Sequence, residues 1–334
     1  MTLIIDATMI VVAISIILVG AALFTNGVEW LGKRLGVSDG MVGSVFAGIG
    51  TALPETMIPI LAIFFGEGAD RAAIGVGAIL GAPFMLSTLT LPLLGAGLLV
   101  FAAAGRRAWT FKLDAEAVII DLRFFLIAYA AAIGAAFTTS RTFHVAVALG
   151  LIVLYLVYLR TLMGHDVVGH GEGLAPLYLA RRSGNPPLLV TGIQVAAGLI
   201  VIIGGAHLFV NTVQDIAILV GVAPLLLSLL ITPVATELPE KLNSLIWISQ
   251  KKDTLAVGNI TGAMVFQGTF PVSVGLIGTP WQLDRFALMS AWLTLISAAA
   301  LLIAMHRTGT WRPAYLMASA LLYGGFGIYL AVGR

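Results

Sequence analysis

Residues 50–55 read GTALPE, and residues 235–240 read ATELPE. Both copies of this polar motif lie within apolar sequence, and in each a Thr and a Glu stand four residues apart, on one helical face, around a Pro. A carboxylate in hydrocarbon is costly, so an acidic residue there indicates a functional site by default. One copy in each half of the chain suggests two halves that close around one cation.

The composition predicts an integral, multi-pass membrane protein surrounded by a lipid bilayer. The 334 residues are 59% hydrophobic and 10% charged, with a mean hydropathy of +1.03, whereas soluble domains carry about 25% charged residues. The net charge of +2 comes from loop residues and gives no reason to expect nucleic-acid binding. The absence of Cys excludes disulfides, thiolate metal sites and cysteine nucleophiles.

Hydropathy predicts an all-α fold of ten transmembrane helices. They are expected at residues 7–31, 40–65, 72–103, 115–137, 143–162, 187–213, 221–249, 254–279, 285–305 and 313–332. One long polar connection divides the chain into a five-helix repeat at 1–165, a cytoplasmic linker at 166–186 and a second five-helix repeat at 187–334. The first apolar run follows Asp6 rather than a basic segment, so we expect a retained helix and not a signal peptide.

Basic residues predict the orientation of these helices. With the N-terminus outside, twelve of the 18 Lys and Arg residues fall in inward segments and four in outward segments. This bias follows the positive-inside rule. Both termini are therefore expected outside, and the protein is expected in the plasma (inner) membrane of a prokaryote.

The two halves align over more than the motif. Residues 20–26 (GAALFTN) match residues 205–211 (GAHLFVN) at the offset of 185 that superposes the motifs. Because each half has an odd number of predicted helices, the second half must enter the membrane from the opposite side. The sequence therefore predicts two inverted repeats, an arrangement typical of secondary transporters with a site near the bilayer midplane.

The motif offers oxygen ligands. A Pro has no amide donor, so Pro54 should free the carbonyl of Gly50 and Pro239 that of Ala235. Carbonyl, hydroxyl and carboxylate oxygens suit calcium or sodium. The alternative is that Glu55 and Glu240 are packing residues satisfied by polar neighbours, with ordinary proline kinks.

On these two motifs, and on GNITG at residues 258–262, the sequence resembles the cation/calcium exchanger superfamily, and within it sodium/calcium exchanger-like antiporters of ten helices. The resemblance implies that Glu55 and Glu240 share a divalent ion, that Thr51, Thr236 and nearby carbonyls serve sodium, and that the first and sixth helices slide together, with Gly20, Gly32, Gly198 and Gly204 as points of compliance. It implies transported calcium and sodium, or protons, and no cofactor. The full set of expected ion-site residues is Gly50, Thr51, Glu55, Ala235, Thr236, Glu237, Glu240, Asn259 and Gln267.

The sequence also departs from the family pattern. Ala52 and Glu237 stand where the family usually has Ser, residues 81–86 (GAPFML) lack the usual Ser and Asn, and Gln267 stands where a carboxylate or Asn is common. The first half has thus lost side-chain ligands. Proton-coupled exchange is therefore an alternative to sodium coupling.

Other polar residues allow two interpretations. Glu237 and Lys241 are four apart, and Lys241 either neutralises a buried charge or stands in for a cation when the site is empty. Asn26 and Asn211 occupy equivalent positions and are expected to bridge their helices to the core. Asp121 and Arg123 are expected to be interfacial.

The sequence thus favours an antiporter that exchanges calcium for sodium by alternating access, with small inorganic cations as partners and a monomer sufficient for transport. A passive cation channel and an inactive paralogue remain alternatives. The sequence contains neither a His-Glu-x-x-His motif nor a Gly-x-Gly-Asp motif, either of which would indicate an enzyme.

Overall fold

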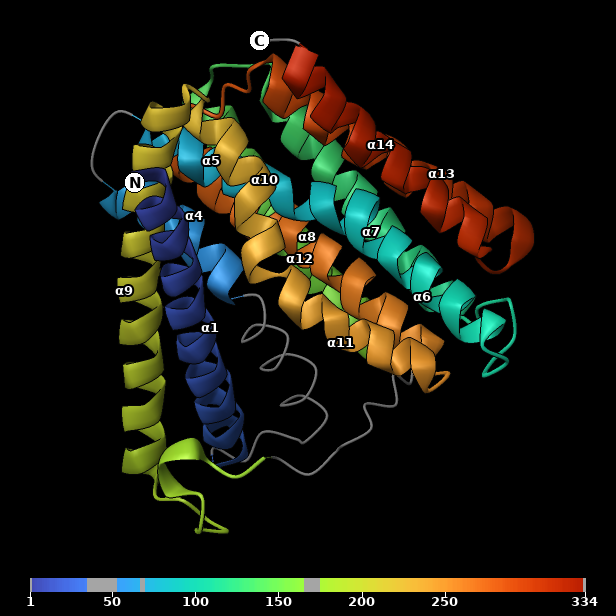
Figure 1. Ribbon diagram of the computed structural model, residues 1–334, viewed down its shortest axis with the longest axis horizontal. Coiled ribbons are helices and arrows are strands. Elements are labelled where there is room, and N and C mark those ends of the chain that lie inside the picture. The colour runs from blue at the N-terminus through green and yellow to red at the C-terminus, as the bar shows by residue number, and fades with distance from the viewer. Residues whose placement is uncertain (1, 35–52, 67–69, 165–174, 333–334) are drawn as a thin grey trace.

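A computed structural model of the chain describes residues 2–34, 53–66, 70–164 and 175–332. All regular secondary structure within these ranges is helical (Figure 1). The helices are α1 (Thr2–Arg34), α4 (Leu53–Phe65), α5 (Arg71–Met85), the π-helix η2 (Leu86–Thr90), α6 (Leu91–Ala103), α7 (Ala115–Ala135), α8 (Arg141–Gly164), the 3₁₀ helix η3 (Tyr178–Ala180), α9 (Leu188–Val220), α10 (Pro224–Thr236), α11 (Leu238–Ser249), α12 (Asp253–Gly278), α13 (Arg285–Thr308) and α14 (Pro313–Val332).

Eight of these helical segments are long and apolar enough to cross a membrane. Two shorter apolar helices, Glu55–Phe65 and Pro224–Val234, belong to the two expected spans that carry the motifs. The expected span at 221–249 is divided into α10 and α11, and of the expected span at 40–65 only the part from residue 53 is described. The all-helical membrane fold is confirmed, whereas the count of ten spans and the domain boundaries stay predictions.

Local sequence explains where several helices begin and end. The Asp114 carboxylate accepts hydrogen bonds from the first-turn amides of α7, and Asp284 does the same for α13, which satisfies donors that a helix start leaves free. Gly221 and Gly309 end α9 and α13 in the left-handed conformation, at φ of 64° and 67°. Glycine adopts this conformation without a Cβ penalty.

Helices α1 and α9 lie side by side as a long pair along one side of the bundle (Figure 1). Their close approach depends on glycine: a Cβ at Gly20 would lie 2.8 Å from the Ile202 nitrogen, and one at Gly198 would lie 2.6 Å from the Phe24 nitrogen. A Cβ at Gly204 would meet nothing within 4 Å, so Gly204 plays no part in the packing of this pair. The environment of Gly32 lies outside the described side chains.

The α1–α9 pair has its own hydrophobic core against the bundle. The cluster joins buried residues of α1, α4, α5 and α9, among them Ile17, Ile58, Ile74 and Phe209. A separate, larger core lies among the other helices and also includes residues of α4 and α5. The pair therefore meets the bundle through a contact surface that involves few elements.

Helices from opposite halves of the chain also pack across each other. A Cβ at Gly77 would lie 2.3 Å from the carbonyl oxygen of Leu225, and one at Gly81 would lie 2.1 Å from that of Leu229, so α5 and α10 touch backbone to backbone. In the other direction, α12 reaches α4, where a Cβ at Gly278 would lie 2.4 Å from Ile63. Gly77 and Gly81 are therefore close-packing residues, which let two helices approach each other.

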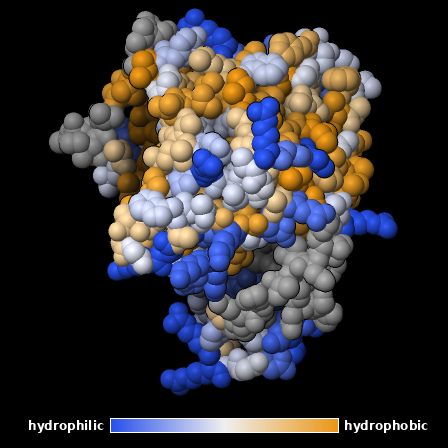
Figure 2. All heavy atoms as spheres, turned by 90° about the vertical axis from the view of Figure 1, so that its right-hand side faces the viewer, coloured by the Kyte–Doolittle hydropathy of each residue, from blue (hydrophilic) through white to orange (hydrophobic). Residues whose placement is uncertain are grey.

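The outer surface is that of a membrane protein. Large apolar side chains such as Ile127, Leu149, Ile200 and Leu321 are more than half exposed. Figure 2 shows hydrophobic side chains over the upper part of one face and hydrophilic side chains gathered below it. In lipid this apolar exposure is favourable, because the surrounding solvent is hydrocarbon.

Asn26 makes different contacts from those expected. Its side chain binds Gln194 of α9 and accepts a hydrogen bond from the Tyr178 amide, and so ties α1 to α9 and to the segment before it rather than to the core. Its repeat partner Asn211 is exposed. The expectation that both residues bridge to the core is wrong, since the Asn26 partners lie on the α9 side.

Candidate cation site

The first motif places one carboxylate in the interior at the start of α4. Glu55 lies in the first turn of this helix and is 4% exposed. Both of its carboxylate oxygens are buried, and neither makes a hydrogen bond to another described residue. The N-terminus of a helix stabilises negative charge. Because no described group bonds the Glu55 oxygens, these oxygens are available to bind a ligand. Gly50 and Thr51 lie outside the described residues.

The second motif interrupts a helix, as the sequence predicts. Helix α10 ends at Thr236, Glu237 lies between the two helices, and α11 begins at Leu238. Pro239 has no amide to donate to the Ala235 carbonyl, which explains the break. Thr236 is fully buried, and its hydroxyl donates to the Thr232 carbonyl at 2.9 Å. The side chains of Ala235 and Glu240 lie outside the described part.

Charged groups of the two halves come together at Lys241, on the first turns of α11. Its Nζ lies 4.0 Å from Oε1 of Glu237 and donates to the Asn259 carbonyl at 3.4 Å. The Lys241 charge also acts on the Glu55 carboxylate of α4. Glu237 and Lys241 are 1% and 4% exposed. The expected Glu237–Lys241 contact therefore exists, and it lies beside the carboxylate of the first motif.

Helix α12 contributes backbone oxygen and amide groups to this region. The Asn259 side chain donates to the Ser244 hydroxyl of α11 at 3.1 Å, while its carbonyl accepts from Lys241. The Asn259 amide thus holds α11 against α12. Gln267 is buried on the same helix, two turns further on.

The third predicted span contains a π-helical turn that the sequence analysis did not anticipate. Pro83 precedes η2, and the hydroxyls of Ser87 and Thr88 both donate to the carbonyl of Phe84. π-Helical turns often occur at functional sites. The signal for it was a helix with Pro83 and Pro92 around a run of Ser and Thr, a combination that interrupts helical hydrogen bonding.

Asp121 is a buried acid that the sequence analysis misplaced. It is 4% exposed on α7 and accepts hydrogen bonds from the hydroxyls of Tyr158 on α8, at 2.9 Å, and of Thr261 on α12, at 2.5 Å. The interfacial assignment is wrong for Asp121, because α7 starts at Ala115 and turns this residue toward α8 and α12. Arg123 is exposed and contacts His306.

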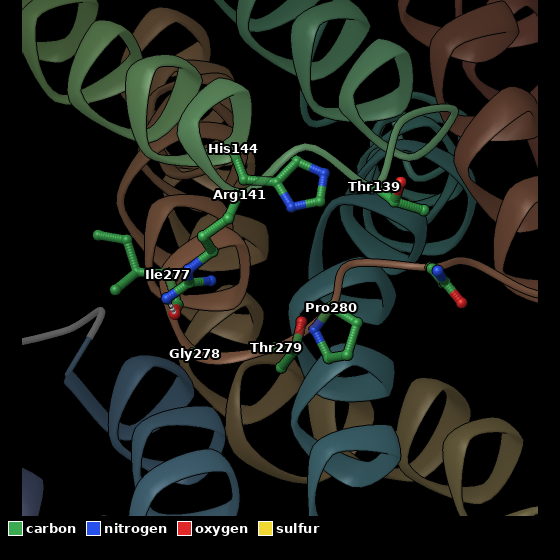
Figure 3. A pocket seen from close by; sticks show the side chains of 8 residues that line it. Thr139, Arg141, His144, Ile277, Gly278, Thr279 and Pro280 are labelled. Carbon is green, nitrogen blue, oxygen red and sulfur yellow. Dashed lines mark hydrogen bonds between the residues drawn. The ribbon is translucent and has the colours of Figure 1, made fainter.

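A pocket of about 320 Å³ lies near the carboxyl end of α12. Arg141 and His144 line it (Figure 3). Arg141 donates to the carbonyls of Leu276 and Ile277, and so caps the end of α12. A guanidinium at its wall does not suit a cation, and the pocket adjoins the end of α4 opposite to Glu55.

Within the described residues, no group of three or more His, Asp or Glu side chains could hold a metal ion. The structure describes five of the expected ion-site residues. They lie on three segments around Lys241 or further along α12, and they are Glu55, Thr236, Glu237, Asn259 and Gln267. The other expected residues, Gly50, Thr51, Ala235 and Glu240, fall outside the described residues or side chains. Their part in ion binding stays a prediction.

Comparison with known proteins identifies the family. Residues 6–164 and 191–332 match the sequence profile described as "Sodium/calcium exchanger protein". The putative antiporter CaxA of Alkalimonas amylolytica is 26% identical over 307 residues, which cover 91% of this chain and 90% of CaxA. The inner membrane protein YrbG of Escherichia coli (strain K12) is 22% identical over 326 residues, which cover 97% of this chain and 95% of YrbG.

Solved structures show the same fold. The H+/Ca2+ exchanger CAX superposes with a TM-score of 0.76 at 16% identity, over 98% of this chain and 82% of CAX. The sodium-calcium exchanger NCX_Mj superposes with a TM-score of 0.57 at 19% identity, over 99% of both chains. The chain therefore belongs to the sodium/calcium exchanger family, in the cation/calcium exchanger superfamily, and is a membrane antiporter rather than an enzyme.

Proposed function

We propose that this antiporter exchanges calcium for sodium by alternating access, with calcium bound between Glu55 and Glu240. The observation that carries the proposal is the Glu55 carboxylate, whose buried oxygens have no hydrogen bond to another described residue. A site prepared for a cation has this property, because its oxygens are kept free of internal donors. Glu240 would supply the second carboxylate from the equivalent position of the repeat.

The charge of the region suits a divalent ion. Glu55, Glu237 and Glu240 with Lys241 carry a net charge of −2 when all are ionised. One calcium ion or two monovalent cations would neutralise that charge, and neutral loading lowers the cost of carrying ions through hydrocarbon. Carboxylate, hydroxyl and carbonyl oxygens are the ligands that calcium and sodium prefer.

The packing between halves supports an inverted repeat. Helix α12 packs on α4 while α6 packs on α11, and α1 pairs with α9. At the offset of 185, α4 corresponds to α11, so an axis in the membrane plane that exchanges the halves would relate these contacts in pairs. Both motifs would then meet near the bilayer midplane of a single chain, and a monomer would suffice for transport.

Proton coupling is the second candidate. The hydroxyls of Thr236, Ser87 and Thr88 are bonded to backbone carbonyls, and the turn at residues 81–86 lacks an amide side chain. Carboxylates, which bind protons as well as metal ions, therefore dominate the described side chains of the site. The similar structures include both an H+/Ca2+ exchanger and a sodium-calcium exchanger.

Radiolabelled calcium uptake into proteoliposomes tests the proposal, with sodium, potassium and pH gradients imposed one at a time. We expect uptake driven by an outward sodium gradient and no uptake with potassium alone. Uptake that follows the pH gradient and ignores sodium would support the second candidate. Calcium entry without any counter-cation would indicate a channel.

A further inference from the structure

Lys241 is an unusual residue for the interior of a membrane protein. Its side chain is 5% exposed, and an ammonium removed from water is costly unless nearby charges and dipoles neutralise it. Its nearest described oxygens come from two segments, Glu237 before α11 and the carbonyl of Asn259 on α12, and its charge also acts on the Glu55 carboxylate of α4. All three of these residues belong to the set expected to bind the transported ion.

The geometry around Lys241 differs from that of a structural ion pair. The same protein contains such a pair between Arg107 and Asp253, where the closest nitrogen and oxygen lie 2.6 Å apart and both carboxylate oxygens accept from the guanidinium. The Lys241 ammonium lies 4.0 Å from Oε1 of Glu237 and 3.4 Å from the Asn259 carbonyl. Charge-assisted hydrogen bonds normally measure about 2.7–2.9 Å. Among the described residues, Lys241 therefore lies near two oxygens without a close bond to either of them.

We propose that the Lys241 ammonium is a resident cation of the transport site, which neutralises the buried carboxylates of that site, Glu237 first among them, in the calcium-free protein and is displaced when calcium binds. This inference rests on the proposed function, since it assigns Lys241 to the same site. The lysine stem is anchored on α11, so the displaced ammonium stays near Glu237 and the Asn259 carbonyl. Lys241 thereby sets the number of monovalent cations that replace one calcium ion.

The consequence can be counted in charges. With Lys241, two monovalent cations neutralise the three carboxylates; without its charge, three are needed. Removal of the charge should also tighten calcium binding, because the ion no longer competes with an ammonium for the negative charge of the site. A lysine that served only to hold α11 against α12, without adding its charge to the site, would change neither the number of competing ions nor the calcium affinity in this direction.

Equilibrium binding of radiolabelled calcium to the purified protein tests the inference. Lys241→Gln is expected to bind calcium at least tenfold more tightly than the wild type, whereas Lys241→Arg, which keeps the charge, is expected to match it. Sodium displacement of bound calcium is expected to show a Hill coefficient higher by one in Lys241→Gln. Lys112→Gln, at an exposed lysine, is the matched control.

The outcomes separate the inference from the proposed function. A wild type that binds no calcium would overturn both. Calcium binding in the wild type with equal or weaker binding in Lys241→Gln, or with an unchanged Hill coefficient, would overturn the inference alone. Lys241→Met, which keeps an unbranched side chain, is the second charge-free variant. If neither folds while Lys241→Arg does, the ammonium is a structural charge and the inference fails.

Discussion

At the residue scale, the sequence identified the buried acids that lie in the repeated motif and missed the one that lies outside it. Glu55 and Glu237 were recognised because each lies in a motif with an internal copy. Asp121 has no such copy, and its partners Tyr158 and Thr261 lie 37 and 140 residues away. Only tertiary packing brings these three residues together, so no local pattern indicated that Asp121 is buried.

Asp121 should contribute to stability through its two hydroxyl donors. Asp121→Asn replaces one carboxylate oxygen with an NH2 donor and removes the charge, so one of the hydroxyls of Tyr158 and Thr261 loses its acceptor and the other donates to a neutral oxygen, which costs about 1.5–3 kcal/mol. We expect a lower melting temperature of the detergent-solubilised protein by tryptophan fluorescence. Asp70→Asn, at an exposed helix start without a side-chain cap, is the control. Equal melting of Asp121→Asn and the wild type would show that the network adds nothing.

At the element scale, hydropathy located the long helices but not the irregular turns within spans. The break at Glu237 followed from Pro239, because a missing amide is a local property. The π-helical turn η2 was not predicted. It depends on the hydrogen bonds that the Ser87 and Thr88 hydroxyls make to a backbone carbonyl and on the packing of α14 against the turn, and the second of these is a tertiary contact. Glycine contacts likewise depend on the neighbouring helix, so the sequence alone does not distinguish Gly198, which packs tightly, from Gly204, which does not.

The α1–α9 contact allows a matched test of those two glycines. Gly198→Ala places a methyl group 2.6 Å from the Phe24 nitrogen and should force the pair apart at a cost of about 1–3 kcal/mol, whereas Gly204→Ala meets nothing within 4 Å. We expect Gly198→Ala to lower both the melting temperature and calcium uptake in proteoliposomes. Similar losses in both variants would contradict the packing assigned to Gly198.

At the scale of the whole molecule, the family and the all-helical membrane fold could be predicted, because both follow from motifs and composition spread over the whole chain. The coupling ion could not, since sodium and protons use overlapping oxygen ligands. The position of Lys241 relative to Glu55 also depends on the packing of the two halves, which the sequence does not state.

The orientation can be tested directly, because the chain contains no Cys and single cysteines have no background. Thr139→Cys lies in the exposed turn between α7 and α8, and Arg106→Cys lies in the exposed turn after α6. From the distribution of basic residues we expect a membrane-impermeant thiol reagent to label Thr139→Cys in intact cells and Arg106→Cys only after permeabilisation. The reverse pattern would invert the orientation.

The central claim is that Glu55 and Glu240 share one calcium ion. Equilibrium calcium binding to purified protein tests it most directly, with Glu55→Gln, Glu240→Gln and, as control at an exposed acid, Glu116→Gln. The account predicts one calcium per chain in the wild type and in Glu116→Gln, and at least a hundredfold weaker binding in each of the other variants. Binding of wild-type strength in folded Glu55→Gln or Glu240→Gln would contradict it.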